Sequence, residues 1–405
     1  MDARIIKTME KHTILSILIP TKNREKYTLN IIQHILSISN ERFQIIIQDN
    51  SDTNRLEELL INYKNDKRLC YYYHSEVLSF VDNFSWGISR CTGEYVTIIG
   101  DDDGINPLIL EITEWAFKNN IEAISPSLPI IYFWPGSGVK FANKGGMLTI
   151  SGFSCKIKFV KPQKELIKYL KQGCNNYLDY NLAKAYHGIV KRSVLEEIKL
   201  KTGRYIGGLS PDIYLSVAIS LLVKRVLIMD YPLTVSGICN QSGSSDSSTG
   251  KHTGELKNAP HFRGHSNYEW SSKIPPFYSV ETIWGDSALA AINDLKQPKY
   301  IEYFNDSILS AYCLKSYPEY KSIILDNLKR NHNNFRNILL VKAQLLKCLI
   351  IIILKNYRKL ILNKFIFRKK YNVFNDIIDM NRVSEISNEF ILKESKIIID
   401  KIQKI

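Results

Sequence analysis

The chain has 405 residues, of which 45% are apolar, 11% aromatic and 23% charged. This balance is typical of a soluble globular protein and excludes collagen-like, mucin-like and wholly disordered chains. The length allows one large domain and a smaller one. With 54 Lys and Arg residues against 40 Asp and Glu residues, the formal net charge is +14. A surface with that excess prefers polyanions, which leaves nucleic acid, nucleotide phosphates and anionic lipid headgroups open as partners.

The seven cysteines are scattered, and no two of them have the C-x-x-C spacing that zinc and redox sites use. Reduced thiols in a cytosolic protein are the simplest interpretation. The apolar run Ile14–Ile19 is shorter than the apolar region of a signal peptide, and Pro-Thr-Lys-Asn follows it instead of a small-residue cleavage site. We therefore expect no export.

From residue 13 onward, short β-branched runs alternate with longer amphipathic stretches. This alternation is typical of βαβ units and of a largely parallel sheet. The expected strands are Thr13–Ile19, Phe43–Gln48, Leu69–Tyr73, Gly93–Gly100 and Ala123–Ser127, and the expected helices between them are Lys26–Ser39, Thr53–Lys64 and Val81–Cys91. Polar residues follow these strands, and polar groups at the carboxyl ends of parallel strands mark a binding crevice.

The next part of the chain is less regular. Residues 128–159 are rich in Gly, Pro and aromatic residues and predict an irregular insertion or an antiparallel excursion. Beyond them we expect the helix Leu166–Gln172, the strand Ala185–Lys191, the helix Ser193–Leu200, and a long helix Pro211–Leu222 with Ser210 as its N-cap.

The C-terminal part differs in composition. Residues 240–254 are rich in Gly and Ser and predict a linker or mobile loop. Beyond about residue 280 the pattern is helical, and residues 336–370 contain ten basic residues and no acidic one. The apolar stretch Cys348–Leu354 is far shorter than the ~20 residues needed to cross a bilayer. This segment is expected to lie on an anionic membrane surface or, alternatively, to pack as a helical bundle with a solvated basic face. No recognition motif for nucleic acid is present, so we expect no nucleic-acid partner.

Three adjacent carboxylates, Asp101, Asp102 and Asp103, directly follow the apolar strand Gly93–Gly100. Like charges this close repel one another, so the arrangement costs stability unless a cation lies among them. Hard oxygen ligands select Mg²⁺ or Mn²⁺, which bind one or two carboxylates together with substrate phosphate oxygens and waters. The triplet therefore suits a metal-bound diphosphate. A solvated acidic turn is the alternative, and the position after a buried strand disfavours it.

Four segments carry a resemblance to a known family. They are, in chain order, TILSILIPTKN (13–23), IIIQDNSD (45–52), GEYVTIIGDDDGINP (93–107) and YHGIVKRSVLEEIKLKTGRYIGGLSPD (186–212). In this order they resemble the motif series of family 2 glycosyltransferases with the GT-A fold, over about residues 13–240. The implied fold class is α/β, a Rossmann-like nucleotide-sugar domain with a mixed, mostly parallel sheet, followed by a helical C-terminal region. The expected division is a GT-A domain at 1–240, a mobile loop and linker at 241–280, and a basic helical domain at 281–405.

The resemblance also assigns residues to the donor. It implies that the first strand and its Pro-Thr turn border the nucleotide, that the second strand ends at the base or ribose, and that the acidic triplet holds the metal and the diphosphate. The implied nucleotide-sugar contacts are Pro20, Thr21, Asn23, Arg24, Asp49, Asn50 and Asp101, and the implied metal ligands are Asp101, Asp102 and Asp103. His187, just ahead of Gly188 on the expected acceptor-side strand, is a further candidate for contact with the donor phosphates or the acceptor, and a buried structural histidine is the alternative. Many members read D-x-D-D, and Gly100 stands here where the first Asp would be. Asp102 is then the best single metal ligand.

The resemblance places a catalytic base at Asp212. Members commonly have an acidic pair at the start of this helix, and Ser-Pro-Asp replaces it here. Such a base removes the proton of the acceptor hydroxyl as that hydroxyl attacks the anomeric carbon. The preceding glycines Gly207 and Gly208 are expected to let an acceptor approach. The alternative is a first-turn aspartate that stabilises the helix dipole.

The sequence therefore predicts an inverting, metal-dependent, non-processive glycosyltransferase. It would transfer one sugar from a nucleotide-sugar, with UDP the expected nucleotide, to a saccharide or an undecaprenyl-type lipid-linked acceptor in bacterial surface polysaccharide synthesis. Its expected place is the cytoplasm, on the inner face of the cell membrane. A sugar-phosphate nucleotidyltransferase is an alternative, although IPTKNRE lacks the glycine-rich turn that such an enzyme needs. A non-catalytic, membrane-associated nucleotide-binding protein is another.

Overall fold

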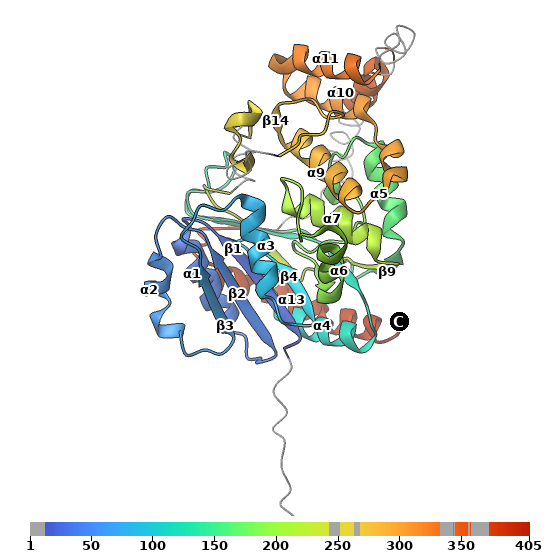
Figure 1. The fold of residues 1–405 in the computed structure, drawn as a ribbon. Helices are drawn as coiled ribbons and strands as arrows, with labels where there is room; N and C mark the ends of the chain where they lie inside the picture. The colour runs from blue at the N-terminus through green and yellow to red at the C-terminus, as the bar shows by residue number, and fades with distance from the viewer. Residues whose placement is uncertain are drawn as a thin grey trace, which may run out of the picture.

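The computed structural model describes residues 13–242, 252–262, 268–332, 345–354 and 372–405, together with Ala343 and Tyr357. These residues form a layered α/β structure in which helices cover both faces of a central sheet (Figure 1). Further helices of the second half of the chain are stacked at one end of the molecule, beyond the edge of the sheet where its parallel strands end.

The central sheet has eight strands in the order β3-β2-β1-β4-β10-β6-β11-β9. Six of them run parallel to one another, and β10 and β9 run in the opposite direction. The strands are β1 (Leu15–Thr21), β2 (Phe43–Asp49), β3 (Leu69–Tyr73), β4 (Tyr95–Ile98), β6 (Ala123–Pro126), β9 (Ile157–Val160), β10 (Ile189–Lys191) and β11 (Val226–Met229). The predicted strands of the first half are therefore confirmed, with ends that differ by at most two residues.

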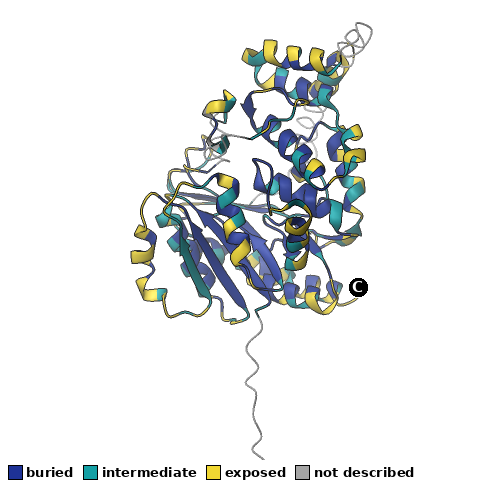
Figure 2. Cartoon of the chain, viewed as in Figure 1, coloured by how far each residue is buried: buried dark blue, intermediate teal, exposed yellow. Residues whose placement is uncertain are grey.

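Burial explains why these apolar runs form the centre of the sheet. All seven residues of β1 are buried, because helices cover both of its faces (Figure 2). Side chains alternate between the faces, so Ile17 and Ile19 pack in one core while Leu18 packs in the other. The first core lies against α1 (Glu25–Leu36), α4 (Leu108–Lys118) and α13 (Met380–Ile402), and the second against α3 (Phe80–Arg90), α5 (Pro162–Lys171), α6 (Arg192–Thr202), α7 (Pro211–Leu222) and α9 (Val280–Asp294).

A second sheet of five strands has the order β15-β8-β7-β12-β5. Its strands are β5 (Gly104–Ile105), β7 (Ile130–Phe133), β8 (Met147–Ile150), β12 (Thr234–Ile238) and β15 (Asn372–Asn375). β7 and β8 pair antiparallel, so residues 128–159 form the antiparallel excursion that was one of the two expectations. β12 pairs with β5, directly after the acidic triplet, and with β7.

The end of the chain returns to the first core. β15 pairs with β8, and α13 buries Met380, Val383 and Ile398 against the apolar side chains around α1 and α4. The predicted division into 1–240, 241–280 and 281–405 does not anticipate that residues 372–405 pack on the sheet domain. It is based on the helical sequence pattern beyond residue 280, whereas the described residues there also include the strand β15. Here α10 (Asp306–Ser316) and α11 (Lys321–Asn331) stack with α9 at one end of the molecule, while residues 372–405 complete the sheet domain (Figure 1).

Local differences from the sequence prediction have simple causes. The helix expected at Thr53–Lys64 is shorter: α2 (Arg55–Leu59) is followed by a 3₁₀ turn. The strand expected from Ala185 begins only at Ile189, because His187 has a left-handed backbone with φ of 56°. Ser210 does not cap the backbone of α7, since its hydroxyl bonds to the Asp212 carboxylate instead.

Two predicted features fall largely outside the described residues. They are the Gly/Ser stretch, of which residues 243–251 are not described, and the basic segment 336–370, of which residues 345–354 form the main described part. Among the described helices, none combines the length and apolar character needed to cross a membrane.

Candidate functional site

The acidic turn Asp101–Asp103 follows β4 at the edge of the sheet where the parallel strands end. The three residues are buried, with only 2%, 4% and 2% of their surface exposed. Buried carboxylates require hydrogen bonds or opposite charges, and here different parts of the chain supply them.

The loop between β1 and α1 holds Asp101. Its Oδ2 accepts a hydrogen bond from the Thr21 hydroxyl at 2.6 Å, and its Oδ1 accepts one from the Arg24 guanidinium at 2.7 Å. Arg24 also donates to the carbonyl oxygen of Gln241 and lies 4.0 Å from Oδ1 of Asp102. The guanidinium therefore compensates part of the negative charge of the turn.

The strand β12 and its continuation hold the other two carboxylates. The backbone N–H of Cys239 donates to Oδ2 of Asp102 at 3.0 Å, and the N–H of Gly237 donates to Oδ1 of Asp103 at 2.7 Å. A Cβ atom at Gly237 would overlap the carbonyl oxygen of Asp102, so only glycine lets this strand come so close.

Burial raises the pKa of Asp102, and the neighbouring carboxylates Asp103 and Asp101 raise it further. Burial also raises the pKa of Asp103, against the opposing effect of the hydrogen bonds from the backbone amides of Gly237 and Gly100. The metal-free turn therefore keeps protons to a higher pH than ordinary aspartates do.

The structure explains the glycine at position 100, where many family sequences have an aspartate. A Cβ atom there would lie 2.8 Å from the Tyr186 hydroxyl and 3.0 Å from a carboxylate oxygen of both Asp102 and Asp103. The Gly100 backbone N–H donates to Asp103 at 2.6 Å. Position 100 therefore has no room for a side chain, and the turn is compact.

Asp102 fits a divalent cation better than its neighbours do. Its Oδ1 lies beyond hydrogen-bond distance of Arg24, whereas both oxygens of Asp101 and of Asp103 accept hydrogen bonds from the chain. One or two carboxylates suffice for a metal that is also bound by phosphate oxygens. In the described part of the chain, no three His, Cys, Asp or Glu side chains gather as a metal centre. The three-residue ligand set stays a prediction.

The predicted donor residues of β1 and β2 lie at the same edge. Asp49 is fully buried: its Oδ1 accepts hydrogen bonds from the backbone and hydroxyl of Ser51, and its Oδ2 accepts one from the Tyr71 hydroxyl at 2.9 Å. Burial raises its pKa. Asn50 donates to the carbonyl oxygens of His74 and Glu76, so it fixes the segment that leads into α3.

The loop that follows β1 is tied to the loop that follows β2. Asn23 has a left-handed backbone, donates to an oxygen of Asp52 at 2.8 Å and accepts from its backbone N–H. Pro20 and Thr21 are buried in the last two positions of β1. The structure thus brings Pro20, Thr21, Asn23 and Arg24 to one edge of the sheet, while their contact with a nucleotide stays a prediction.

His187 connects the acidic turn to the second predicted site. Its Nε2 lies 3.3 Å from Oδ2 of Asp103, and its Nδ1 lies 2.9 Å from the Thr234 hydroxyl. Burial lowers the pKa of His187 to about 3, with a contribution from the positive charge of Lys184, while Asp212 acts in the opposite direction. The imidazole is therefore neutral at neutral pH and feels the charge of Asp212.

Asp212 lies in the first turn of α7 and is partly buried. The Ser210 hydroxyl donates to its Oδ1, and the Tyr177 hydroxyl and two backbone amides of the helix start also bond to it. Burial raises its pKa despite these hydrogen bonds. A carboxylate with a raised pKa, held in place by hydroxyl groups, is suited to accept a proton.

Gly207 and Gly208 have a packing role that the sequence did not suggest. A Cβ atom at Gly207 would overlap the Asp294 carboxylate, and one at Gly208 would lie 2.9 Å from Ser287. Both contacts are with α9. The two glycines therefore allow α9 to approach. Gly207 also lines the cavity described next, and the approach of an acceptor to these glycines stays a prediction.

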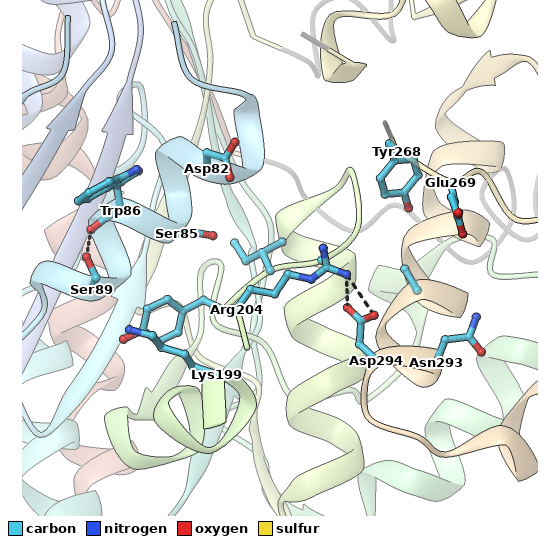
Figure 3. A pocket seen from close by; sticks show the side chains of 14 residues that line it. Asp82, Ser85, Trp86, Ser89, Lys199, Arg204, Tyr268, Glu269, Asn293 and Asp294 are labelled. Atoms are coloured by element: carbon cyan, nitrogen blue, oxygen red, sulfur yellow. Dashed lines mark hydrogen bonds and ion pairs between the residues drawn. The ribbon is translucent and has the colours of Figure 1, made fainter. Parts of the chain in front are cut away.

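A cavity of about 800 Å³ opens between α3, the α6–α7 loop and α9 (Figure 3). Trp86 and Asp82 line it on one side, and Tyr268 and Asp294 line it on the other. Arg204 extends between them and bonds to Asp294 at 3.1 Å. Neither the acidic turn nor Asp212 lines this cavity, so its size does not identify the reacting groups.

Sequence reasoning missed the residues of β12 and Cys239, which directly follows that strand. Thr234, Gly237 and Cys239 bond to His187, Asp103 and Asp102, yet two of these three contacts use only the backbone. The one available signal was the glycine inside a strand, which indicates close approach of another chain segment.

Comparison with known families bears on these assignments. Residues 16–133 match the model of the family described as Glycosyl transferase family 2. This part of the chain therefore resembles glycosyltransferase family 2. With the topology above, this confirms the predicted GT-A-like α/β fold, with a mixed sheet of mostly parallel strands and a helical C-terminal region. The family 2 match includes β1, β2, β4 and the acidic turn, and it ends before Asp212.

Curated relatives match about a quarter of the chain. An uncharacterized glycosyltransferase of Rickettsia bellii (strain RML369-C) is 29% identical over 89 residues, which is 22% of this chain and 13% of the relative. Glycosyltransferase GlyG of Streptococcus pneumoniae serotype 4 (strain ATCC BAA-334 / TIGR4) is 26% identical over 99 residues, which is 24% of this chain and 33% of the relative. The match thus spans a third or less of the length of these relatives.

Solved structures with a related overall shape include S. aureus TarS 1-349, with a TM-score of 0.42 and 11% sequence identity over 80% of this chain and 92% of that chain. The structure titled S. aureus TarS 1-349 in complex with UDP-GlcNAc has a TM-score of 0.41, 11% identity, and coverage of 80% of this chain and 93% of that chain.

Proposed function

We propose that the protein is a hexosyltransferase-type glycosyltransferase that moves one sugar from a nucleotide-sugar, with UDP the expected nucleotide, to a hydroxyl of a saccharide or lipid-linked acceptor. The family 2 domain supports sugar transfer. The observation that carries the proposal is the position of His187, which lies 3.3 Å from Asp103 on one side and feels the charge of Asp212 on the other. Both carboxylates therefore act on one buried imidazole, which supports placing the donor side and the acceptor side in one site.

In the proposed reaction, Asp212 accepts the proton of the acceptor hydroxyl while the oxygen attacks the anomeric carbon. The bond between that carbon and the nucleoside diphosphate breaks in the same step, so the configuration inverts. Hydrogen bonds from the Ser210 and Tyr177 hydroxyls orient the Asp212 carboxylate for this role. No nucleophilic side chain is needed.

The donor side needs positive charge, because negative charge develops on the departing diphosphate. Mg²⁺ or Mn²⁺ bound at Asp102 would supply that charge when present. The protein's own contribution is Arg24, which lies between Asp101 and Asp102, and the backbone amides of β12 that fix the turn.

Release of free nucleotide from UDP-, GDP- and dTDP-sugars tests this function, with Mn²⁺ or Mg²⁺ present and candidate acceptors added. We expect one donor to release nucleoside diphosphate, and chelation of the metal to stop the release. If the nucleotide-sugar is instead converted, only when pyrophosphate is added, to a nucleoside triphosphate and a sugar 1-phosphate, the protein is a nucleotidyltransferase. If nucleotide-sugars bind but none reacts, the non-catalytic binding protein is the correct description.

The membrane part of the proposal rests on the described residues 345–354, which are helical. Four apolar side chains at spacings of four, three and one residues are 48–62% exposed: Leu346, Ile350, Ile353 and Leu354. This spacing puts them on one side of a helix, in a segment whose charged residues are all basic. We propose that this side contacts an anionic membrane at the cytoplasmic face, where surface polysaccharide precursors would be extended.

Flotation with vesicles tests the membrane contact. The native chain should float with phosphatidylglycerol vesicles and much less with phosphatidylcholine vesicles. Changing Leu346 and Ile353 to Glu should abolish flotation. Leu200→Glu is a matched control, because Leu200 is 86% exposed on α6, outside this segment. Equal flotation of all variants would refute the contact.

A further inference from the structure

Lys184 carries a positive charge that the described part of the chain does not compensate. It is partly buried, and desolvation lowers its pKa to about 8. Among the described residues, Lys184 makes a cation–π contact with the ring of Tyr177, whose centroid lies 5.5 Å from Nζ. No described carboxylate lies within 4.0 Å of the ammonium group. A partly buried charge in this state is unfavourable until an anion joins it.

The position of Lys184 links it to the proposed reaction. The hydroxyl of Tyr177 bonds to Asp212, so the same tyrosine contacts the proposed base and the unpaired ammonium. The charge of Lys184 also acts on His187, which lies beside Asp103. Lys184 therefore lies close to the tyrosine that contacts Asp212, and its charge influences the histidine that lies beside Asp103.

The turn that carries Lys184 is tight. A Cβ atom at Gly188 would overlap the carbonyl oxygen of Lys184, so the chain between these residues folds back closely on itself. The Ala185 carbonyl accepts a hydrogen bond from the backbone of Ile98 in β4. The backbone of Lys184 is thus anchored to the sheet next to the strand that leads into the acidic turn.

Other cations at this edge already have partners. Arg24 bonds to Asp101 and to the Gln241 carbonyl, and Lys22 bonds to the Asn50 carbonyl and to Asp52. Lys184 differs from Arg24 and Lys22, because no carboxylate of the described residues pairs with it.

We propose that Lys184 binds a phosphate group of the substrate beside Asp212, an inference that rests on the proposed function. An ammonium group that is partly desolvated forms strong charge-assisted hydrogen bonds with phosphate oxygens. Two sources present this chemistry: the diphosphate of the nucleotide-sugar, and a phosphate carried by the acceptor.

Calorimetric titration of the full chain with pyrophosphate and Mg²⁺, and then with inorganic phosphate at saturating pyrophosphate, tests the proposal. Lys184→Met should weaken the affinity for pyrophosphate or for inorganic phosphate by about tenfold or more. Lys184→Arg should retain most of the affinity for both anions. Loss of pyrophosphate binding would assign Lys184 to the donor. Loss of phosphate binding alone would assign it to the acceptor.

Lys171→Met is the matched control, because Lys171 is exposed and its Nζ lies 5.4 Å from the ring centroid of Tyr303. It should bind both anions like the native chain. Melting temperatures check folding, and Lys184→Met should not melt lower, since it removes an uncompensated charge. If Lys184→Met melts at a lower temperature than the native chain, Lys184→Gln is used as the neutral variant instead.

Native-like binding of both anions by the neutral variant would overturn the proposal, as would a native chain that binds neither anion. Failure of the proposed function gives a different result. In that case no nucleotide-sugar reacts, whereas anion binding still depends on Lys184.

Discussion

The acidic turn and the region around Asp212 are the two sides of the proposed site, and their charged groups have different partners. At the turn, Asp101 is paired with Arg24 and Thr21, and Asp103 with backbone amides of Gly100 and Gly237. The contacts that the described residues make with the Asp212 carboxylate come from hydroxyls and helix amides, and Lys184 has no anionic partner in the described chain. The protein itself compensates the charges of the acidic turn, whereas in the proposed site a substrate supplies the charge opposite to Lys184.

The largest expected effect comes from removing the proposed base. Asp212→Asn retains the size and hydrogen-bonding ability of the side chain but cannot accept the proton. We expect kcat to fall about 10²- to 10⁴-fold while donor affinity stays near that of the native enzyme. Steady-state kinetics together with donor titration measure both quantities. A variant with native kcat would show that Asp212 only stabilises the start of α7.

Removing the charge that compensates the turn should lower stability. Arg24→Met leaves the buried carboxylates of Asp101 and Asp102 without their cation, and breaking a buried pair in this way costs roughly 3 to 5 kcal/mol. Because 21% of the Arg24 side chain is exposed, we expect the lower end of that range. Urea unfolding of the metal-free protein measures the change.

Lys22→Met provides the comparison for Arg24. Lys22 is a neighbouring cation in the same loop, but its partner Asp52 is 72% exposed, so its loss should cost about 1 kcal/mol or less. Equal stability of the two variants would mean that Arg24 does not compensate the turn.

The close approach of the β12 backbone to the acidic turn can be tested in the same way. Gly237→Ala places a methyl group against the Asp102 carbonyl oxygen, so β12 has to move away from the turn. We expect a loss of about 1 to 3 kcal/mol in the free energy of unfolding and weaker donor binding. Gly152→Ala is the control, because nothing lies within 4 Å of a Cβ atom there. If both variants resemble the native chain, β12 is not fixed against the turn.

A smaller effect should appear in the pH dependence on the Asp212 side. Burial raises the pKa of Asp212, and the hydrogen bond from Tyr177 opposes this by stabilising the charged form. Activity should therefore be lost as the pH falls through the raised pKa. Tyr177→Phe removes the opposing hydrogen bond, so this acidic limb should move to higher pH. A limb that stays in place or moves to lower pH would contradict this assignment.

The sequence was sufficient for much of the sheet because fully buried parallel strands read as continuous apolar runs, as in IIIQ at the end of β2. It also placed the acidic turn after β4 and Asp212 at the start of α7, since both follow from strand and helix boundaries. In the structure His187 lies 3.3 Å from Asp103 and is influenced by the charge of Asp212, whereas the sequence named His187 only as a candidate contact.

Other features could not be predicted because they depend on contacts between distant segments. Pairing of β15 with β8 joins residues 372–375 to residues 147–150, and no local pattern names the partner. The role of β12 rests largely on backbone amides, which every residue except proline carries. Lys184 was missed because lysine is usually solvated, and only the fold shows that this one is partly buried beside Tyr177.

The most direct test of the account measures donor binding and sugar transfer side by side for Asp102→Asn and Asp212→Asn, with and without Mn²⁺. The account predicts that Asp102→Asn loses the Mn²⁺-dependent part of donor affinity, and that Asp212→Asn binds the donor normally but does not transfer sugar. The same loss of affinity in both variants, or transfer at the native rate by Asp212→Asn, would contradict the division of the site into a donor side and an acceptor side.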